Sequence, residues 1–174
     1  MPQVYIGVGS NIEPRRHVAA ALDSLAAQFG ALVLSPVYES EAIGFQGEPF
    51  LNLVVGLETD SPVADLMARL RRIESENGYA GGAPKFSARS LDLDLLLYGD
   101  SEGVIDGVEL PRPDITAYAY VLWPLADIAG DGVHPHFGVA FAELRRNFRE
   151  SQSLHPVTFL WRGRDLSLGA LSTR

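Results

Sequence analysis

The chain has 174 residues, of which 47% are hydrophobic and 21% are charged. This balance supplies one domain with a sizeable core and argues against a disordered chain. The formal net charge of −8 argues against general binding of nucleic acid or anionic membranes, because both require a basic surface. The sequence contains no cysteine, which excludes disulfides and thiolate metal sites.

Residues 1–7 have no basic start and no long apolar stretch, so they do not resemble a signal peptide. No apolar run approaches the roughly 20 residues of a membrane-spanning helix. We therefore expect a cytoplasmic protein with small-molecule partners, associated with neither nucleic acid nor a membrane. We expect it to be a monomer.

The first half of the chain predicts a strand, a helix and two more strands. Residues 4–8 are a β-rich run that ends at Gly9. A helix is expected next, because Pro14 suits a first helical turn and Gly30 suits a helix end. Residues 32–38 and 50–57 are expected to be strands, with a loop at 39–49. The buried face of the helix is predicted from apolar residues at helical spacing, namely Val18, Leu22, Leu25 and Phe29.

A second helix is predicted to begin with Ser61 as its N-cap and Pro62 in the first helical position, and to end at Gly78. A loop at 79–89 then leads to a strand at 91–98. The order β-α-β-β-α-β predicts an α+β, ferredoxin-like sandwich with helices on one face of the sheet.

The chain is less regular after Gly99, and residues 131–174 are expected to be a C-terminal extension of a single domain spanning 1–174. Residues 110–113 predict a rigid extended stretch, 120–125 a buried segment and 141–148 a short helix. Residues 157–161 and 165–168 flank a turn-forming glycine, Gly163, and predict a terminal hairpin.

Two acidic residues in the strand at 91–98 carry the sharpest chemical signal. Side chains alternate across a strand, so Asp92 and Asp94 share one face, with Cα atoms roughly 6.6 Å apart. Such a pair repels unless a cation lies between the carboxylates, and Mg²⁺ prefers carboxylate oxygens together with substrate phosphates. On alternation alone, a solvated polar face explains the pattern equally well. The opposite face, toward the core, is expected to hold Leu91, Leu93, Leu95 and Leu97.

The loop before this strand favours the metal interpretation, because Lys85 and Arg89 could neutralise charge that develops during phosphoryl transfer.

Other motifs are weaker. Gly7-Val8-Gly9 lacks the third glycine of a dinucleotide fingerprint, and residues 81–85 lack the spacing of a P-loop. His134 and His136 are expected to be solvated loop residues.

Several short motifs occur in a characteristic order, and the run Arg-Ser-Leu-Asp-Leu-Asp at 89–94 is the most specific of them. With this order and spacing, about residues 4–129 resemble the 6-hydroxymethyl-7,8-dihydropterin pyrophosphokinase family. The other matching motifs are Gly9-Ser10-Asn11, Tyr38 through Gly44, Pro49-Phe50-Leu51-Asn52, Ile73-Glu74 with Gly78, and Trp123-Pro124-Leu125.

The resemblance implies transfer of a pyrophosphoryl group from ATP to the hydroxymethyl group of the dihydropterin, with release of AMP, in folate biosynthesis. It implies two Mg²⁺ ions held by Asp92 and Asp94, and it matches Arg89 to an arginine that contacts the ATP phosphates. Together with Lys85 of the preceding loop, these residues are the expected catalytic group. The implied pterin-binding residues are Ser40, Ile43, Phe50, Asn52, Phe86 and Tyr120. The implied nucleotide-binding residues are Arg71, Glu74, Arg89 and Arg112.

The chain departs from the family pattern around the phosphates. An arginine of the family's catalytic loop is Tyr79 here, a tryptophan is Phe86, and a Gly-Pro pair is Ser87-Ala88. The histidine of the usual Pro-His-Pro is Arg112, and a later arginine is Tyr118. Each lost charge-assisted contact costs on the order of 1.5–3 kcal/mol of phosphate binding, so the resemblance is to a divergent member.

These departures leave a second hypothesis open, a non-catalytic or altered-specificity homologue that binds pterin or nucleotide. A third, a ferredoxin-like RNA-binding or sensor module, is disfavoured by the acidic balance and by the missing basic-aromatic sheet motif.

Overall fold

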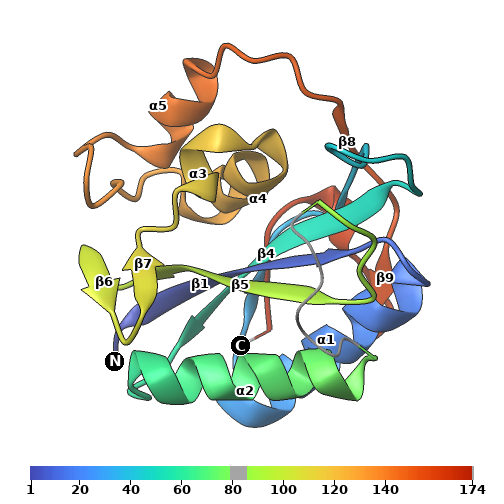
Figure 1. The fold of residues 1–174 in the computed structure, drawn as a ribbon, viewed down its shortest axis with the longest axis horizontal. Helices are drawn as coiled ribbons and strands as arrows, with labels where there is room; N and C mark the ends of the chain where they lie inside the picture. Colours follow the sequence, from blue (N-terminus) through green and yellow to red (C-terminus); the bar gives the residue numbers. More distant parts are fainter. Residues whose placement is uncertain (79–85, 174) are drawn as a thin grey trace.

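The computed structural model describes residues 1–78 and 86–173, and it shows a mixed α+β fold, as the sequence predicted (Figure 1). A central sheet separates two helical layers, with α1 and α2 below it and α3, α4 and α5 above it in the view of Figure 1. The elements of the first half are β1 (Gln3–Ser10), α1 (Pro14–Phe29), β2 (Val33–Leu34), β3 (Tyr38–Ser40), β4 (Phe50–Glu58), α2 (Val63–Glu76) and β5 (Asp92–Tyr98).

The second half of the chain adds shorter elements around this framework. They are β6 (Gly103–Ile105), β7 (Val108–Leu110), α3 (Asp114–Ala117), α4 (Ala119–Ala129), α5 (Phe141–Arg146), β8 (Leu154–Pro156), β9 (Leu160–Trp161), β10 (Arg164–Asp165), the 3-10 turn η1 (Leu166–Leu168) and β11 (Leu171–Ser172). None of the helices described in the structure has the length and apolar character needed to cross a bilayer.

The sheet has the order β11-β2-β4-β1-β5, with β3 paired to β4 and to β8. β1 lies between β4 and β5 and is antiparallel to both. The two βαβ units are therefore interleaved, which confirms the ferredoxin-like arrangement predicted from the element order. Because β1 lies between β4 and β5, a residue of β1 has a paired neighbour in each of these two strands.

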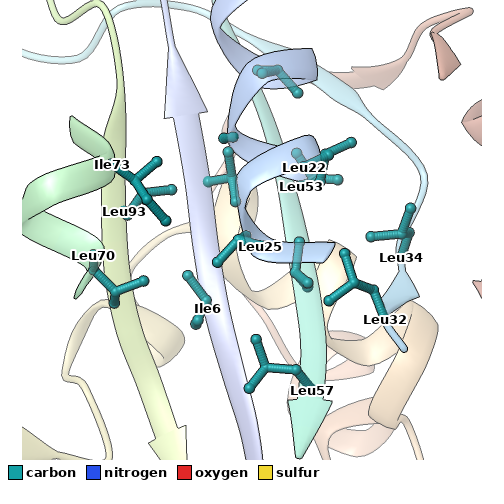
Figure 2. Close-up of a cluster of buried hydrophobic side chains, with 14 of the residues drawn as sticks. Ile6, Leu22, Leu25, Leu32, Leu34, Leu53, Leu57, Leu70, Ile73 and Leu93 are labelled. Carbon is teal, nitrogen blue, oxygen red and sulfur yellow. The ribbon is translucent and has the colours of Figure 1, made fainter. Parts of the chain in front are cut away.

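The larger core lies between the sheet and the first two helices (Figure 2). α1 runs from Pro14 to its cap at Gly30, whose φ of 79° lies in the left-handed region that favours glycine. The predicted apolar stripe of α1 packs here, with Leu22 and Leu25 fully buried. Ile6, Leu53 and Leu93 meet it from the three central strands (Figure 2).

A second core on the opposite face was not predicted from the sequence. The segment at 120–125 was expected to be buried, and it is, but it forms most of α4. Leu122 and Leu125 of α4 pack on Val54 of β4 and Leu96 of β5. The sheet is consequently covered on both faces, and the expectation of helices on one face is wrong.

A break in the β1–β5 register explains a further correction. Tyr5 pairs with Leu97 but Ile6 pairs with Leu95, so Leu96 is an extra residue in β5. A β-bulge of this kind exchanges the faces of the residues beyond it. Leu97, expected on the same face as Leu95, therefore packs in the second core.

Two other boundaries differ from the sequence prediction. The expected strand at 32–38 is split into β2 and β3, and Pro36, which has no N–H to donate, lies between them. Ser61 is not the N-cap of α2, because Pro62 stands at that position with an extended ψ of 154° and the helix begins at Val63. The backbone N–H of Ser61 instead donates to Oγ1 of Thr59.

The C-terminal extension returns to the sheet. The expected short helix and hairpin are present as α5 and as β9–β10, which are joined by Arg162 and Gly163 with positive φ. In addition, β8 pairs with β3 and β11 pairs with β2. These pairings cover strand edges whose N–H and C=O groups would otherwise be unpaired.

Candidate active site

A pocket opens on the face of the sheet that carries α3 and α4, and it gathers most of the residues singled out in the sequence. The sequence-predicted residues that line it are Ser40, Ile43, Phe50, Asn52, Phe86, Arg89, Asp92, Asp94, Arg112 and Tyr120. Gly9, Glu41, Phe45, Ser87 and Asp114 complete the lining. Lys85 lies outside the described residues.

Three residues form a row across the floor of the pocket. Gly9 of β1 pairs with Asn52 of β4 on one side and with Asp92 of β5 on the other. Directly opposed residues of antiparallel strands project to the same face. The amide and the carboxylate therefore flank a position without a side chain, and a Cβ built on Gly9 would lie 3.2 Å from Oδ1 of Asn52.

We expect Gly9→Ala to weaken pterin binding roughly tenfold without lowering the melting temperature. The added methyl group would push on the amide of Asn52, whereas the extended strand backbone accepts alanine. Titration of a fluorescent pterin measures the affinity. Gly56→Ala is the control, because this β4 glycine also lacks a positive φ and its added Cβ would lie 3.1 Å from the ring of Tyr5, away from the pocket. Unchanged pterin affinity in Gly9→Ala would contradict this role of the floor.

The pair Asp92 and Asp94 lies at the β5 end of this pocket, each carboxylate facing one arginine. Nη1 of Arg89 is 3.2 Å from Oδ1 of Asp92, and Nη2 of Arg112 is 3.5 Å from Oδ1 of Asp94. Burial and the neighbouring Asp92 charge raise the pKa of the Asp94 carboxyl to about 7. Because Arg112 also faces Asp114, the two arginines do not balance the three aspartates, and a cation would stabilise the remaining negative charge.

Within residues 1–78 and 86–173, no three histidine, aspartate or glutamate side chains are grouped as a complete metal site. The acidic pair therefore offers part of a coordination shell and leaves the rest to other ligands. This is the donor set that Mg²⁺ uses when substrate phosphates and water supply the remaining oxygens.

Arg112 stands where β7 leads into α3, after a cis Leu110–Pro111 bond. Its backbone N–H donates to the carbonyl of Leu96, and its guanidinium lies between Asp94 and Asp114, 3.5 Å from an oxygen of each. Among the described residues, its Nε is the buried side-chain polar atom without a hydrogen bond. The guanidinium is thus held at the pocket by the charges of both carboxylates, with its Nε facing Oδ1 of Asp114.

The β4 end of the pocket combines amide, hydroxyl and aromatic groups. Nδ2 of Asn52 donates to Oγ of Ser40 at 2.7 Å, and both side chains are buried. Phe50 meets Phe45 edge to face at 6.3 Å between ring centroids. Burial, followed by nearby acidic groups, raises the pKa of Tyr120, so its hydroxyl stays protonated. Such a site suits a flat, polar-edged ring.

Asn11 holds together the two loops that border the pocket, a role that the sequence did not assign to it. Its backbone N–H donates to the carbonyl of Arg89, and its Oδ1 accepts from the N–H of Arg89 at 2.7 Å. Its Nδ2 donates to the carbonyl of Glu48 in the 41–49 loop. The signal was present in the motif Gly9-Ser10-Asn11, but only the fold brings these loops together.

We expect Asn11→Ala to lower stability by about 2 kcal/mol and to reduce affinity for both pterin and nucleotide. The substitution leaves the Arg89 N–H and the Glu48 carbonyl without their side-chain partners. Urea unfolding and ligand titration measure the two effects. Asn77→Ala, which removes one helix-end bond to Ile73, is the control and should lower stability alone. Full ligand affinity in Asn11→Ala would contradict the assignment.

Arg71 and Glu74, predicted as nucleotide-binding, do not line the pocket. Glu74 is fully buried, pairs with Arg71, and accepts from the backbone N–H of Leu93 at 2.8 Å. Arg71 donates to the carbonyl of Leu93. Burial raises the pKa of Glu74, although these hydrogen bonds oppose the shift. Arg71 and Glu74 therefore hold α2 against β5 at Leu93, the residue between Asp92 and Asp94.

The fold belongs to the α+β, ferredoxin-like class, and its pocket sets an acidic pair and two arginines beside aromatic and amide side chains. The chain belongs to the 7,8-dihydro-6-hydroxymethylpterin-pyrophosphokinase (HPPK) family, whose model matches residues 5–130.

Relatives from three bacteria, each a 2-amino-4-hydroxy-6-hydroxymethyldihydropteridine pyrophosphokinase, support this assignment. The Pseudomonas aeruginosa enzyme is 37% identical over 133 residues, 74% of this chain and 82% of the relative. The Haemophilus influenzae enzyme is 31% identical over 88% of this chain and 98% of the relative. The Aquifex aeolicus enzyme is 29% identical over 90% and 96%. The chain is accordingly an ATP-dependent pyrophosphokinase of folate biosynthesis.

Proposed function

We propose that the pocket performs a Mg²⁺-dependent transfer of pyrophosphate from ATP to the hydroxymethyl group of the dihydropterin, with Asp92 and Asp94 as the metal ligands. The observation that carries the proposal is the row Asn52–Gly9–Asp92, in which an amide and a carboxylate lie on opposite sides of a glycine. A pterin at Asn52 would thus present its substituent toward the acidic pair.

The β4 end of the pocket would bind the pterin. Asn52, fixed by Ser40, would contact the polar edge of the ring, because an amide both donates and accepts. Phe50, Tyr120 and Phe86 would contact its faces, and Ile43 would close the apolar border.

The β5 end of the pocket would hold the triphosphate. Two Mg²⁺ ions at Asp92 and Asp94 would supply charge stabilisation to the transferred group and hold it in line. Arg89 would contact phosphate oxygens from the position in which Asn11 fixes its backbone. Arg112, whose guanidinium lies beside Asp94, would add a second cation, and Lys85 a third.

The transfer forms one bond and breaks one bond at the β-phosphorus of ATP. The hydroxymethyl oxygen attacks that atom and gives up its proton to solvent, and the bond to the oxygen that stays with AMP breaks. The hydroxyl is a poor nucleophile, so alignment of the two substrates supplies much of the rate. Arg89 and Arg112 would supply positive charge where the equatorial oxygens become more negative.

The nucleotide base and ribose would lie toward α2 and β7, near Arg71 and Glu74. Because Glu74 is committed to Leu93, we propose that it acts by holding Arg71 and β5 in place. We propose further that the protein works as a monomer in the cytoplasm, where ATP and the pterin are small diffusible partners.

The test is AMP release from ATP by the pure protein in the presence of 6-hydroxymethyl-7,8-dihydropterin. The proposal predicts AMP and the pterin diphosphate in equal amounts, and no turnover when EDTA removes divalent cations. Pterin binding with nucleotide uptake but no AMP would identify the non-catalytic homologue that Arg112 and Tyr118 leave open. Turnover that is unaffected by EDTA would overturn the metal assignment.

A further inference from the structure

Three aromatic rings contact one another in a row beside the pocket, and the middle ring is one that the family pattern does not supply. Tyr118 stacks on Tyr120, with ring centroids 5.1 Å apart and an interplanar angle of 18°. Phe86 meets the ring of Tyr118 edge to face at 6.2 Å. Phe86 and Tyr120 line the pocket, whereas Tyr118 does not.

Tyr118 is anchored by its backbone and by the second core. It is the extended residue between α3 and α4, with φ −129° and ψ 127°. Its N–H donates to the carbonyl of Asp114, and its carbonyl accepts from Val121 and Leu122. Its ring also packs on the second core. The hydrogen bonds fix the backbone of Tyr118, and the second core supports its ring beside the two rings that it contacts.

Phe86, by contrast, is held in a conformation that needs support. Its φ of 58° lies in the left-handed region, which is unfavourable for a residue with a bulky side chain. Its ring lies against Gly44 of the 41–49 loop, so closely that a Cβ on Gly44 would be 3.2 Å from Cβ of Phe86. Strain of this kind persists where surrounding contacts determine the geometry, and it concentrates at binding sites.

We propose that Tyr118 is a positioning residue for the pterin: its ring fixes Tyr120 and Phe86 at the pocket before the substrate arrives. The inference rests on the proposed function of the pocket. Ordering a side chain on binding costs affinity, so a support that orders two aromatic side chains in advance raises affinity for the ring they contact. Tyr118 takes the place of an arginine in the family pattern, and here it would support the pterin instead of the phosphates.

The test compares Tyr118→Leu with Tyr118→Phe by pterin and nucleotide titration. We expect Tyr118→Leu to weaken pterin binding roughly tenfold and to leave the Kd of a non-hydrolysable ATP analogue within about twofold. Tyr118→Phe keeps the ring and should retain wild-type pterin affinity. Phe148→Leu is the matched control, because Phe148 also makes an edge contact in the same helical layer, to Trp123, away from the pocket.

Combination with Phe86→Leu tests the coupling directly. If Tyr118 acts through Phe86, the double variant loses less pterin affinity than the product of the two single losses. Equal loss of pterin and nucleotide affinity in Tyr118→Leu, or pterin affinity unchanged from wild type, would overturn the inference while leaving the proposed function intact. Failure of the wild-type protein to bind pterin would instead refute the proposed function.

Discussion

Replacing Asp94 with asparagine is expected to lower kcat on the order of a thousandfold while the protein stays folded. Asparagine keeps the size of the side chain but removes the charge that would hold the metal ions and the triphosphate. The same result is expected for Asp92→Asn. AMP release under saturating ATP and pterin measures the effect, and circular dichroism checks the fold.

Asp100→Asn is the matched control, because this carboxyl is exposed in the turn that follows β5. It should retain wild-type kcat. If Asp94→Asn unfolds, or if it turns over at the wild-type rate, the acidic pair is structural or dispensable, and the assignment of the site fails.

The pH dependence of stability gives an independent measure of the same carboxyl. The raised pKa of Asp94, about 7, means that the folded protein keeps a proton that the unfolded chain releases near pH ~4. The free energy of unfolding of the metal-free protein should therefore fall as pH rises through this window. The fall should be smaller in Asp94→Asn, and chemical denaturation at pH 5 and pH 8 measures the difference.

Replacing Arg89 with alanine should lower kcat/KM for ATP on the order of a hundredfold or more. The guanidinium is mostly buried at 17% exposure, 3.2 Å from Asp92, so its loss removes a phosphate contact and leaves that carboxylate with less neutralisation. Arg89→Lys keeps the charge but loses the planar fork, and we expect an intermediate value. Steady-state kinetics with varied ATP measures all three.

Arg72→Ala on the exposed side of α2 controls for the loss of a positive charge and should change kcat/KM less than twofold. A matching loss in Arg72→Ala would assign the effect to the net charge of the protein. An Arg89→Ala enzyme with wild-type ATP kinetics would remove Arg89 from the site.

The sequence predicted the first part of the fold well because its signals there are local. Alternation in β5 separates the aspartates from Leu91, Leu93 and Leu95, and these leucines are buried in the larger core as expected. The pattern could not reveal the bulge at Leu96, since an extra residue in one strand is defined only by its partner. It also could not reveal that α4 covers the second face, because a short apolar run does not distinguish helix from strand.

The candidate site, too, was predictable from the sequence only where its signals are local. The acidic pair was found from its spacing, and Arg89 and Lys85 from the loop before it, whereas the other site residues came from the resemblance. The fold brings ten of all these predicted residues to one pocket. In the sequence, Asn11 was only one residue of the motif Gly9-Ser10-Asn11, and Tyr118 was only a departure from the family pattern. Their contacts join segments distant in the chain, Asn11 to Glu48 and Arg89, and Tyr118 to Phe86. No periodicity along the chain encodes such contacts.

Binding of Mn²⁺ in the presence of α,β-methylene ATP, followed by electron paramagnetic resonance, tests the central claim most directly. The account predicts two Mn²⁺ ions per wild-type chain with the analogue bound, and loss of protein-bound Mn²⁺ in the double variant Asp92→Asn, Asp94→Asn. Undiminished Mn²⁺ binding by that double variant would contradict the claim that these two carboxylates hold the metal against the triphosphate.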